Sequence, residues 1–156
     1  MLDQAKLCQY LTAYEPFHDS PVDMGALLDS SHLKLIKNEG KVYFGEVNLR
    51  KKEGMGVYCH RGSKLYEGHF YNNEKQGQGV EIYANGNLYI GQFSSNKKHG
   101  QGVFYWFSLG QGSREGQQVE CFEGQWWGGL PDGAGIHQKV NGDCYTGSFK
   151  NGLKHG

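Results

Sequence analysis

The chain has 156 residues, of which 37% are apolar and 21% are charged, so it offers material for about one domain with a modest core. Its 16 basic residues balance its 16 acidic ones, which argues against a binder of nucleic acid, because such proteins usually carry a basic face. The 25 glycines and ten tyrosines, beside only three prolines, favour turn-rich β structure over a disordered linker.

Residues 1–40 form an N-terminal segment without internal repetition. Apolar residues recur at helical spacing over residues 2–14, which predicts an amphipathic helix, and Asp23 is expected to cap a short second helix that runs through Leu28. We expect this mostly helical segment to fold back over the first hairpin as a cap, because repeat arrays need protected ends. The alternative is a helix that binds a partner or a membrane surface, although its single basic residue, Lys6, is little for a membrane.

The sequence lacks the features of an exported or membrane-spanning chain. No apolar run approaches the roughly 18–20 residues that cross a bilayer as a helix. The N-terminus has no basic stretch followed by an apolar one, as a signal peptide would. We therefore expect an intracellular, cytoplasmic protein.

Residues 41–156 are built from a repeated unit, which is the mark of a repeat protein. Each unit begins with an aromatic residue followed two places later by glycine, and successive units start 23 residues apart except for one gap of 33. Counting from this start as position zero, further glycines stand at +11 and, in the four longer units, at +13. The units cover residues 43–65, 66–88, 89–121 with an insertion, 122–144 and, in part, 145–156.

The spacing within a unit predicts a β-hairpin. Side chains two residues apart share one face of a strand, so the start residue, the +2 glycine and the +4 residue point the same way. The missing side chain at +2 is expected to leave a slot for an aromatic ring from a neighbouring strand. The polar stretch from +5 to +11 predicts the turn, and the second strand is expected to begin near +12.

Stacking of these hairpins defines the expected fold. An isolated hairpin is marginally stable in water, whereas stacked hairpins share a core between neighbours. We therefore predict an all-β protein: a single elongated, twisted antiparallel meander of stacked hairpins over residues 41–156, preceded by a short, mostly helical N-terminal segment.

Three stretches of the second unit match the pattern of a known family. They are Tyr66-Glu67-Gly68-His69-Phe70, Gly77-Gln78-Gly79-Val80 and Tyr83-Ala84-Asn85-Gly86-Asn87. Together they resemble the MORN (membrane occupation and recognition nexus) repeat. The resemblance implies MORN-type hairpins over residues 43–156 and a scaffold of cytoskeletal, ciliary or membrane-associated assemblies. It further implies binding of phospholipid, capture of a partner's peptide or helix in an aromatic groove, dimerisation, or a place beside a catalytic domain.

The aromatic face of the predicted sheet is the first candidate site. Left uncovered, it would exceed the few hundred Å² of apolar surface that soluble monomers usually expose, so we expect a protein partner to cover it. The predicted partner-binding groove consists of Tyr66, Phe70, Tyr89, Phe93, Trp126, Tyr145 and Phe149. The last unit stops within its hairpin, and its unpaired edge is expected to allow self-association.

Basic residues in the predicted turns of alternate units form the second candidate site. Stacked turns would align them on one rim, which either binds anionic lipids such as phosphoinositides or only keeps the surface soluble. This rim consists of Arg50, Lys51, Lys52, Lys97, Lys98 and Lys154. Trp127, which follows the +4 residue Trp126, is expected either to project outward as an interface anchor or to pack under the insertion of the third unit.

No motif predicts catalysis. The Gly-x-Gly pairs do not complete a dinucleotide-binding motif, the seven histidines lack metal-ligand spacing, and the four cysteines form no Cys-x-x-Cys pair. We therefore predict no enzyme activity, no catalytic residue, no metal site and no cofactor. The expected function is binding of a protein partner, with two alternatives: binding of anionic phospholipid, or regulation of an enzyme carried on another chain.

Overall fold

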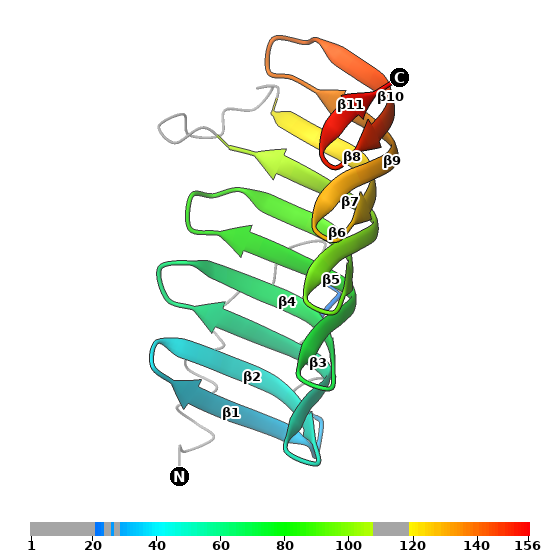
Figure 1. Ribbon diagram of the computed structural model, residues 1–156. Helices are drawn as coiled ribbons and strands as arrows, with labels where there is room; N and C mark the ends of the chain where they lie inside the picture. The colour runs from blue at the N-terminus through cyan, green and yellow to red at the C-terminus, as the bar shows by residue number, and fades with distance from the viewer. Residues whose placement is uncertain (1–20, 24–25, 27–28, 108–118) are drawn as a thin grey trace.

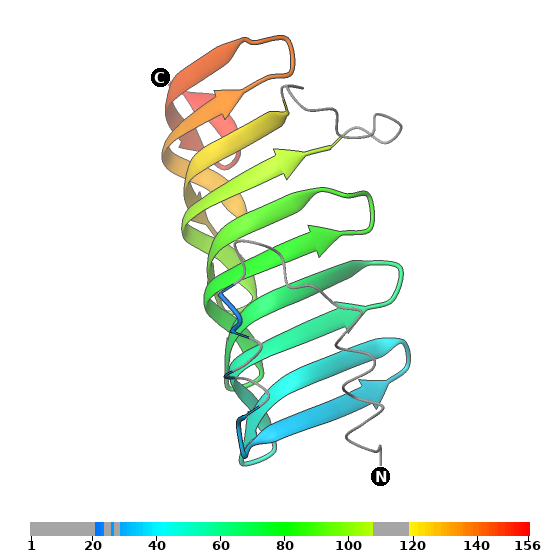
Figure 2. The same cartoon turned by 180° about the vertical axis from the view of Figure 1, so that it is seen from behind.

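The computed structural model describes residues 21–23, 26, 29–107 and 119–156, and its strands form one open antiparallel sheet (Figure 1). Eleven strands lie in the sheet in chain order. They are β1 (Leu33–Asn38), β2 (Lys41–Asn48), β3 (Lys51–His60), β4 (Lys64–Tyr71), β5 (Glu74–Tyr83), β6 (Leu88–Ser94), β7 (Lys97–Trp106), β8 (Glu120–Trp127), β9 (Leu130–Gln138), β10 (Cys144–Lys150) and β11 (Leu153–His155). The predicted all-β meander is confirmed, and two opposite views show an elongated array (Figures 1 and 2).

The N-terminal part contains a strand that was not predicted. β1 pairs with β2, so the sheet begins inside the segment expected to be mostly helical. The helix expected over residues 2–14 lies outside the described residues. The Ala26 N–H donates to Asp23 Oδ1 at 3.1 Å, but residues 24–25 and 27–28 of the second helix, expected to run through Leu28, also lie outside the described residues. Val22 is buried against Phe44 of β2.

Each unit closes with a two-residue turn at +6 and +7. In the second unit these residues are Asn72 and Asn73, with φ of 49° and 72°, the left-handed values that a type I′ turn requires and asparagine tolerates. The second strand therefore begins at +8, and the prediction of a turn from +5 to +11 was wrong. The first residues of the second strand, after +7, are polar because they lie at the exposed hairpin tip. Their polarity is typical of a loop, and for this reason the sequence pattern placed the turn too far along the chain.

A β-bulge bends every complete hairpin at its paired glycines. In the second unit Gly68 lies opposite Gly79, and the register shifts before Phe70 pairs with Lys75. The same shift follows the +2 glycine in the other three complete units. Because a bulge bends the strand that carries it, the hairpin tips fold over against the long arms of the sheet (Figure 1). We call the side enclosed by this bend the inner face and the opposite side the outer face.

A continuous stack of aromatic rings forms the core on the inner face. The ring of Tyr66 lies 5.1 Å from the rings of Phe70, in its own unit, and Phe93, in the next, edge to face in both pairs. Phe70 lies 5.1 Å from the ring of Tyr43 in the preceding unit. Each +4 ring thus joins two units, and such pairs add about 0.5–1.5 kcal/mol beyond the burial of their area.

The repeated glycines make room for the start residue of their own unit. A Cβ at Gly79 would lie 2.5–2.8 Å from atoms of the Tyr66 ring, and one at Gly68 would meet the Tyr66 hydroxyl and the backbone of β5. The ring over the +2 glycine therefore comes from the same strand, and not from a neighbouring strand as predicted. The Tyr66 hydroxyl then donates to the His69 carbonyl oxygen at 2.9 Å, which satisfies the buried phenol.

Candidate binding surface

The residues predicted to line a partner-binding groove lie in the core. Six of the seven are at most 5% exposed, and Tyr145 is half-buried. The six are Tyr66, Phe70, Tyr89, Phe93, Trp126 and Phe149. The bend of the hairpins covers their ring faces, so a partner cannot reach them without opening the core. Replacing Phe70 or Phe93 would therefore test the fold before it tested binding.

Three half-buried aromatic side chains extend this core toward solvent on the inner face. Tyr58, Tyr83 and Trp106 come from the second strands of the first three units and pack against the buried rings. The ring of Trp106 lies 4.6 Å from that of Phe104 and 5.8 Å from that of His137, which carries the ring surface from the third unit into the fourth. We call Tyr58, Tyr83 and Trp106 the inner-face aromatics.

Position +9 holds lysine in four of the five units, and these side chains lie across the aromatic rings. They are Lys52, Lys75, Lys98 and Lys154. The Lys98 Nζ lies within 4.7–5.4 Å of four ring centroids, nearest to Phe104. The Lys52 Nζ lies 4.9 Å from the ring of Tyr58, and the other two contact the start tyrosines of their own units. Ring faces attract ammonium groups at such distances.

The turn of the following unit bonds to the backbone of two of these lysines on both sides, and to that of Lys98 through the Gly129 N–H alone. The N–H of Lys52 donates to Asn73 Oδ1 at 2.9 Å, and the N–H of Asn73 donates to the Lys52 carbonyl oxygen at 3.0 Å. Lys75 and Asn96 make the same two bonds, at 2.9 and 3.1 Å. The +7 asparagines of the second and third units, whose left-handed φ the turn needs, therefore also hold Lys52 and Lys75 at a fixed distance from the following unit.

Burial lowers the pKa of three of these lysines, among them Lys75, where the charge of Glu81 acts in the opposite direction. Burial lowers the pKa of Lys52, and the nearby charge of Lys41 lowers it further. It also lowers the pKa of Lys98, where attraction to Glu81 acts in the opposite direction. Among the residues that the structure describes, no carboxylate lies within ion-pair distance of Lys52 or Lys98. Both ammonium groups are thus partly withdrawn from water and have no counter-ion among the described residues.

A buried acid pairs with the middle lysine. Glu81 is 3% exposed and forms an ion pair with Lys75, which is 7% exposed. Lys64 adds a second ion pair to Glu81 at 3.2 Å. Burial opposes ionisation of Glu81, but the charges and hydrogen bonds of the two lysines outweigh it, so the pKa of Glu81 lies below its usual 4.5.

The six residues predicted to form a basic rim do not share one surface. Arg50 lies in the first turn, and Lys51 and Lys97 occupy exposed +8 positions at the tips. The remaining three, at +9, turn inward over the rings. Because the second strand begins at +8, the neighbouring lysines at +8 and +9 point to opposite faces of the sheet. In the irregular turn that was predicted, they could have shared one rim. Binding of anionic lipid by this rim stays a prediction.

Trp127 lies at a hairpin tip with other exposed apolar side chains. It is 68% exposed, Leu130 is 49% exposed and Leu153 is 72% exposed. The ring of Trp127 lies 4.7 Å from that of His99, at the tip of the preceding unit. Exposure of this tryptophan fits the expected interface anchor, and its use as an anchor stays a prediction.

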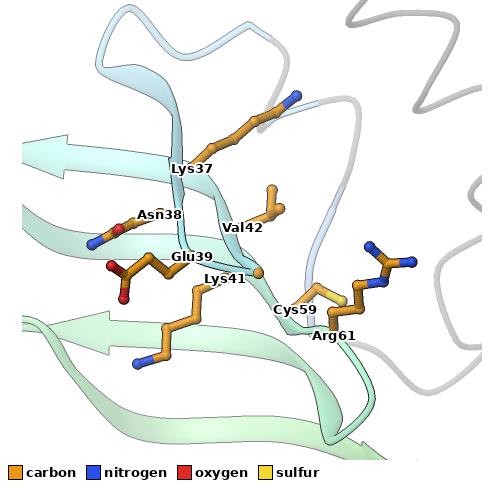
Figure 3. Close-up of a pocket in the computed structure, with 8 residues that line it drawn as sticks. Lys37, Asn38, Glu39, Lys41, Val42, Cys59 and Arg61 are labelled. Atoms are coloured by element: carbon orange, nitrogen blue, oxygen red, sulfur yellow. The ribbon is translucent and has the colours of Figure 1, made fainter.

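Other parts of the described chain offer little chemistry. His137 Nε2 lies 2.8 Å from Glu120 Oε1, and no three His, Cys, Asp or Glu side chains gather as metal ligands in the described ranges. A shallow pocket lies at the turn between β1 and β2. Its charged side chains point apart: Lys37 and Arg61 extend to one side and Lys41 to the other (Figure 3).

Sequence reasoning missed Lys64, Lys75 and Glu81. The pattern that would have found Lys75 is the lysine column at +9, which is visible once the turn is placed at +6 and +7. Glu81 stands at +15, where the first and third units carry Tyr58 and Phe104. An acid in an aromatic column predicts a buried ion pair, because an unpaired charge there would be too costly.

Comparison with known families agrees with this geometry. The MORN repeat matches at residues 66–88, 89–111, 122–144 and 145–156, and the chain belongs to the MORN-repeat family. The hairpin 43–65 has the same bulge and the same ring over its glycines. No curated protein matches the chain. In the described residues, no helix is long and apolar enough to cross a membrane.

Proposed function

We propose that this chain is a non-enzymatic interaction module that holds a segment of a partner protein on its inner face, against the inner-face aromatics. The row of Tyr58, Tyr83 and Trp106 carries this proposal. Each ring is anchored on the core and half open to solvent. Aromatic side chains of this kind are typical binding anchors, because they offer a large contact area and lose little conformational freedom.

The support under these rings favours the same function. Neighbouring units are joined by edge-to-face ring pairs and by the backbone bonds of the +7 asparagines. A surface held in this way is ordered before a partner arrives, so less of the binding free energy is lost in ordering it. A scaffold in a cytoskeletal, ciliary or membrane-associated assembly and a regulator of an enzyme on another chain would both use such a surface.

Site-specific cross-linking tests this proposal. A photoreactive phenylalanine analogue replaces Tyr83 in one protein and Tyr71 in another, and each is irradiated in an extract of the chain's own cells. Tyr83 lies on the inner face, whereas Tyr71 is 64% exposed at a hairpin tip, so the pair differs mainly in position. We expect residue 83 to cross-link to one continuous segment of one partner, located by mass spectrometry. Cross-links from residue 71 alone would contradict the inner-face assignment.

A second candidate function is peripheral binding to an anionic membrane through the hairpin tips. Arg50, Lys51 and Lys97 are exposed there, and Trp127 and Leu130 offer apolar contact at the tip of the fourth unit. Basic residues near a charged bilayer contribute about 1 kcal/mol each. This function predicts co-sedimentation with phosphoinositide liposomes that is lost in Lys51→Glu/Lys97→Glu. Binding that survives this double change would remove the tips from consideration.

A further inference from the structure

The charges of the inner face indicate what kind of segment it takes, and this inference rests on the proposed function. We propose that the inner face binds an acidic peptide segment, with one carboxylate on Lys52 and another on Lys98. These two lysines lie on either side of Lys75, which forms an ion pair with Glu81. Among the described residues, the inner face therefore presents two lysines without an acid of their own, one on each side of Lys75, whose acid Glu81 is shared with Lys64.

In the part of the chain that the structure describes, Lys52 and Lys98 lack a counter-ion. The described chain supplies Lys75 with Glu81 but supplies neither flanking lysine with an acid. Both ammonium groups rest on rings, at 4.9 Å from Tyr58 and 4.7 Å from Phe104. Because they are partly withdrawn from water, a carboxylate would interact with them more strongly than with fully solvated lysines.

The spacing of the two lysines gives the spacing of the acids. Lys52 lies in β3 and Lys98 in β7, four strands apart in the sheet. At the usual separation of strands this is about 19 Å, which an extended peptide crosses in about six residues. A helical segment laid along the array would need acids about 13 residues apart. The peptide between them would contact Tyr83, which lies within reach of Lys98 at 5.2 Å.

The orientation of the lysines distinguishes a peptide from a membrane. Lys51 and Lys97 precede Lys52 and Lys98 in sequence but are exposed at the tips, whereas Lys52 and Lys98 are half-buried over the rings. A flat bilayer meets the tips first, and only a narrow chain can follow the rings between them. The chain thus supplies its own matched pair of control residues.

Peptide display tests the inference. Random peptides long enough to span both lysines are selected on the full chain, and the affinities of the enriched peptides are measured by fluorescence anisotropy. We expect pairs of acidic residues at one of the two spacings. Lys52→Gln or Lys98→Gln should weaken binding about tenfold or more, as expected for loss of a charge-assisted bond. Lys51→Gln and Lys97→Gln should change it less than about twofold, since exposed charges contribute little.

Other outcomes distinguish the specificity for acidic peptides from the proposed binding of a partner segment on the inner face. The enriched peptides could lack paired acids and yet bind more weakly to Tyr83→Ala, in a variant that circular dichroism shows to be folded. This result would support the inner face as a docking surface and overturn its specificity for acidic peptides. Equal losses at residues 97 and 98 would show unspecific charge attraction and overturn it too. If no peptide is enriched, both the acidic specificity and the proposed function are overturned. Self-association of the chain that Lys98→Gln abolishes would also overturn both, because it would assign the inner face to a second copy of the chain.

Discussion

The ring of Tyr66 occupies the space that a side chain at residue 79 would need. The three atoms nearest to a Cβ at Gly79 all belong to that ring, at 2.5–2.8 Å. At Gly68, in contrast, two of the three nearest atoms are backbone atoms of β5, within 2.7 Å. The Tyr66 side chain thus makes the three closest contacts at Gly79, whereas at Gly68 both the backbone of β5 and the Tyr66 hydroxyl crowd the Cβ.

A double-mutant cycle tests this difference. Gly79→Ala should destabilise the chain by about 1–3 kcal/mol, as overpacking does, and most of this loss should disappear in a Tyr66→Ala background. Gly68→Ala should stay costly in the Tyr66→Ala background, because backbone atoms block its Cβ even without the Tyr66 hydroxyl. Free energies of unfolding from urea titrations check both cycles. Equal coupling of the two alanines to Tyr66 would contradict the assignment.

The tyrosine hydroxyls of the core are the subject of the second prediction. Burial raises the pKa of Tyr66, which keeps its hydroxyl a donor to the His69 carbonyl oxygen at 2.9 Å. Tyr66→Phe should therefore cost about 1 kcal/mol of unfolding free energy. Tyr145→Phe is the control, because its bond to the Ser148 carbonyl oxygen is longer, 3.2 Å, and exposed. A larger loss at residue 145 than at residue 66 would refute this reasoning.

The neighbouring tryptophans allow a comparison of core and surface. Trp126 is 4% exposed and its Nε1 donates to the Gly102 carbonyl oxygen at 3.0 Å, which joins the third and fourth units across the insertion. Trp126→Phe should cost about 2 kcal/mol, from the lost bond and the lost volume. Trp127→Phe should stay within about 0.5 kcal/mol, since that ring is exposed. Thermal unfolding of the two variants side by side measures the contrast.

The ion pairs of Glu81 make the stability of the fold depend on pH. The pKa of Glu81 is lower in the folded state than its usual 4.5, so its ion pairs stabilise the fold above that value and are lost as the pH falls through the lower, folded pKa. Glu81→Gln should cost about 3 kcal/mol at neutral pH, because it leaves Lys75 buried without its acid. The difference from the unchanged chain should shrink below pH 4.5.

The double variant Lys75→Met/Glu81→Leu is the control for this pair. It removes both charges from the core and should be more stable than Glu81→Gln, since apolar replacements of a buried ion pair are often tolerated. Unfolding free energies at several pH values measure both variants. A pH-independent difference between Glu81→Gln and the unchanged chain would show that the charge of Glu81 does not stabilise the fold.

Much of the fold was predictable because the same hairpin pattern recurs several times in the sequence. The columns of aromatic residues and glycines fixed the period, the strand faces and the meander. The strand β1 escaped prediction because it precedes the period, although the alternation Leu33-Lys34-Leu35 and the turn residues Glu39-Gly40 are consistent with a short hairpin arm.

The candidate site was harder to predict for a different reason. A period shows which side chains share a face, but only the bulge at the glycines shows that this face folds on itself. That bend turns Phe70 and Phe93 from predicted contact residues into core. It also turns Lys52 and Lys98 away from the rim and onto the rings. The bend depends on the register shift between two strands, which no single column of the sequence displays.

The three tryptophans of the chain make the most direct test of binding on the inner face, because they lie in three different places. Trp106 is an inner-face aromatic, Trp126 is in the core and Trp127 is exposed at a tip. The measurement is fluorine NMR of the tryptophan-labelled chain during titration with the partner segment that cross-linking identifies. We predict that the Trp106 resonance shifts with the binding curve while that of Trp127 does not move. A shift of Trp127 with Trp106 unchanged would contradict binding on the inner face and place the partner on the hairpin tips.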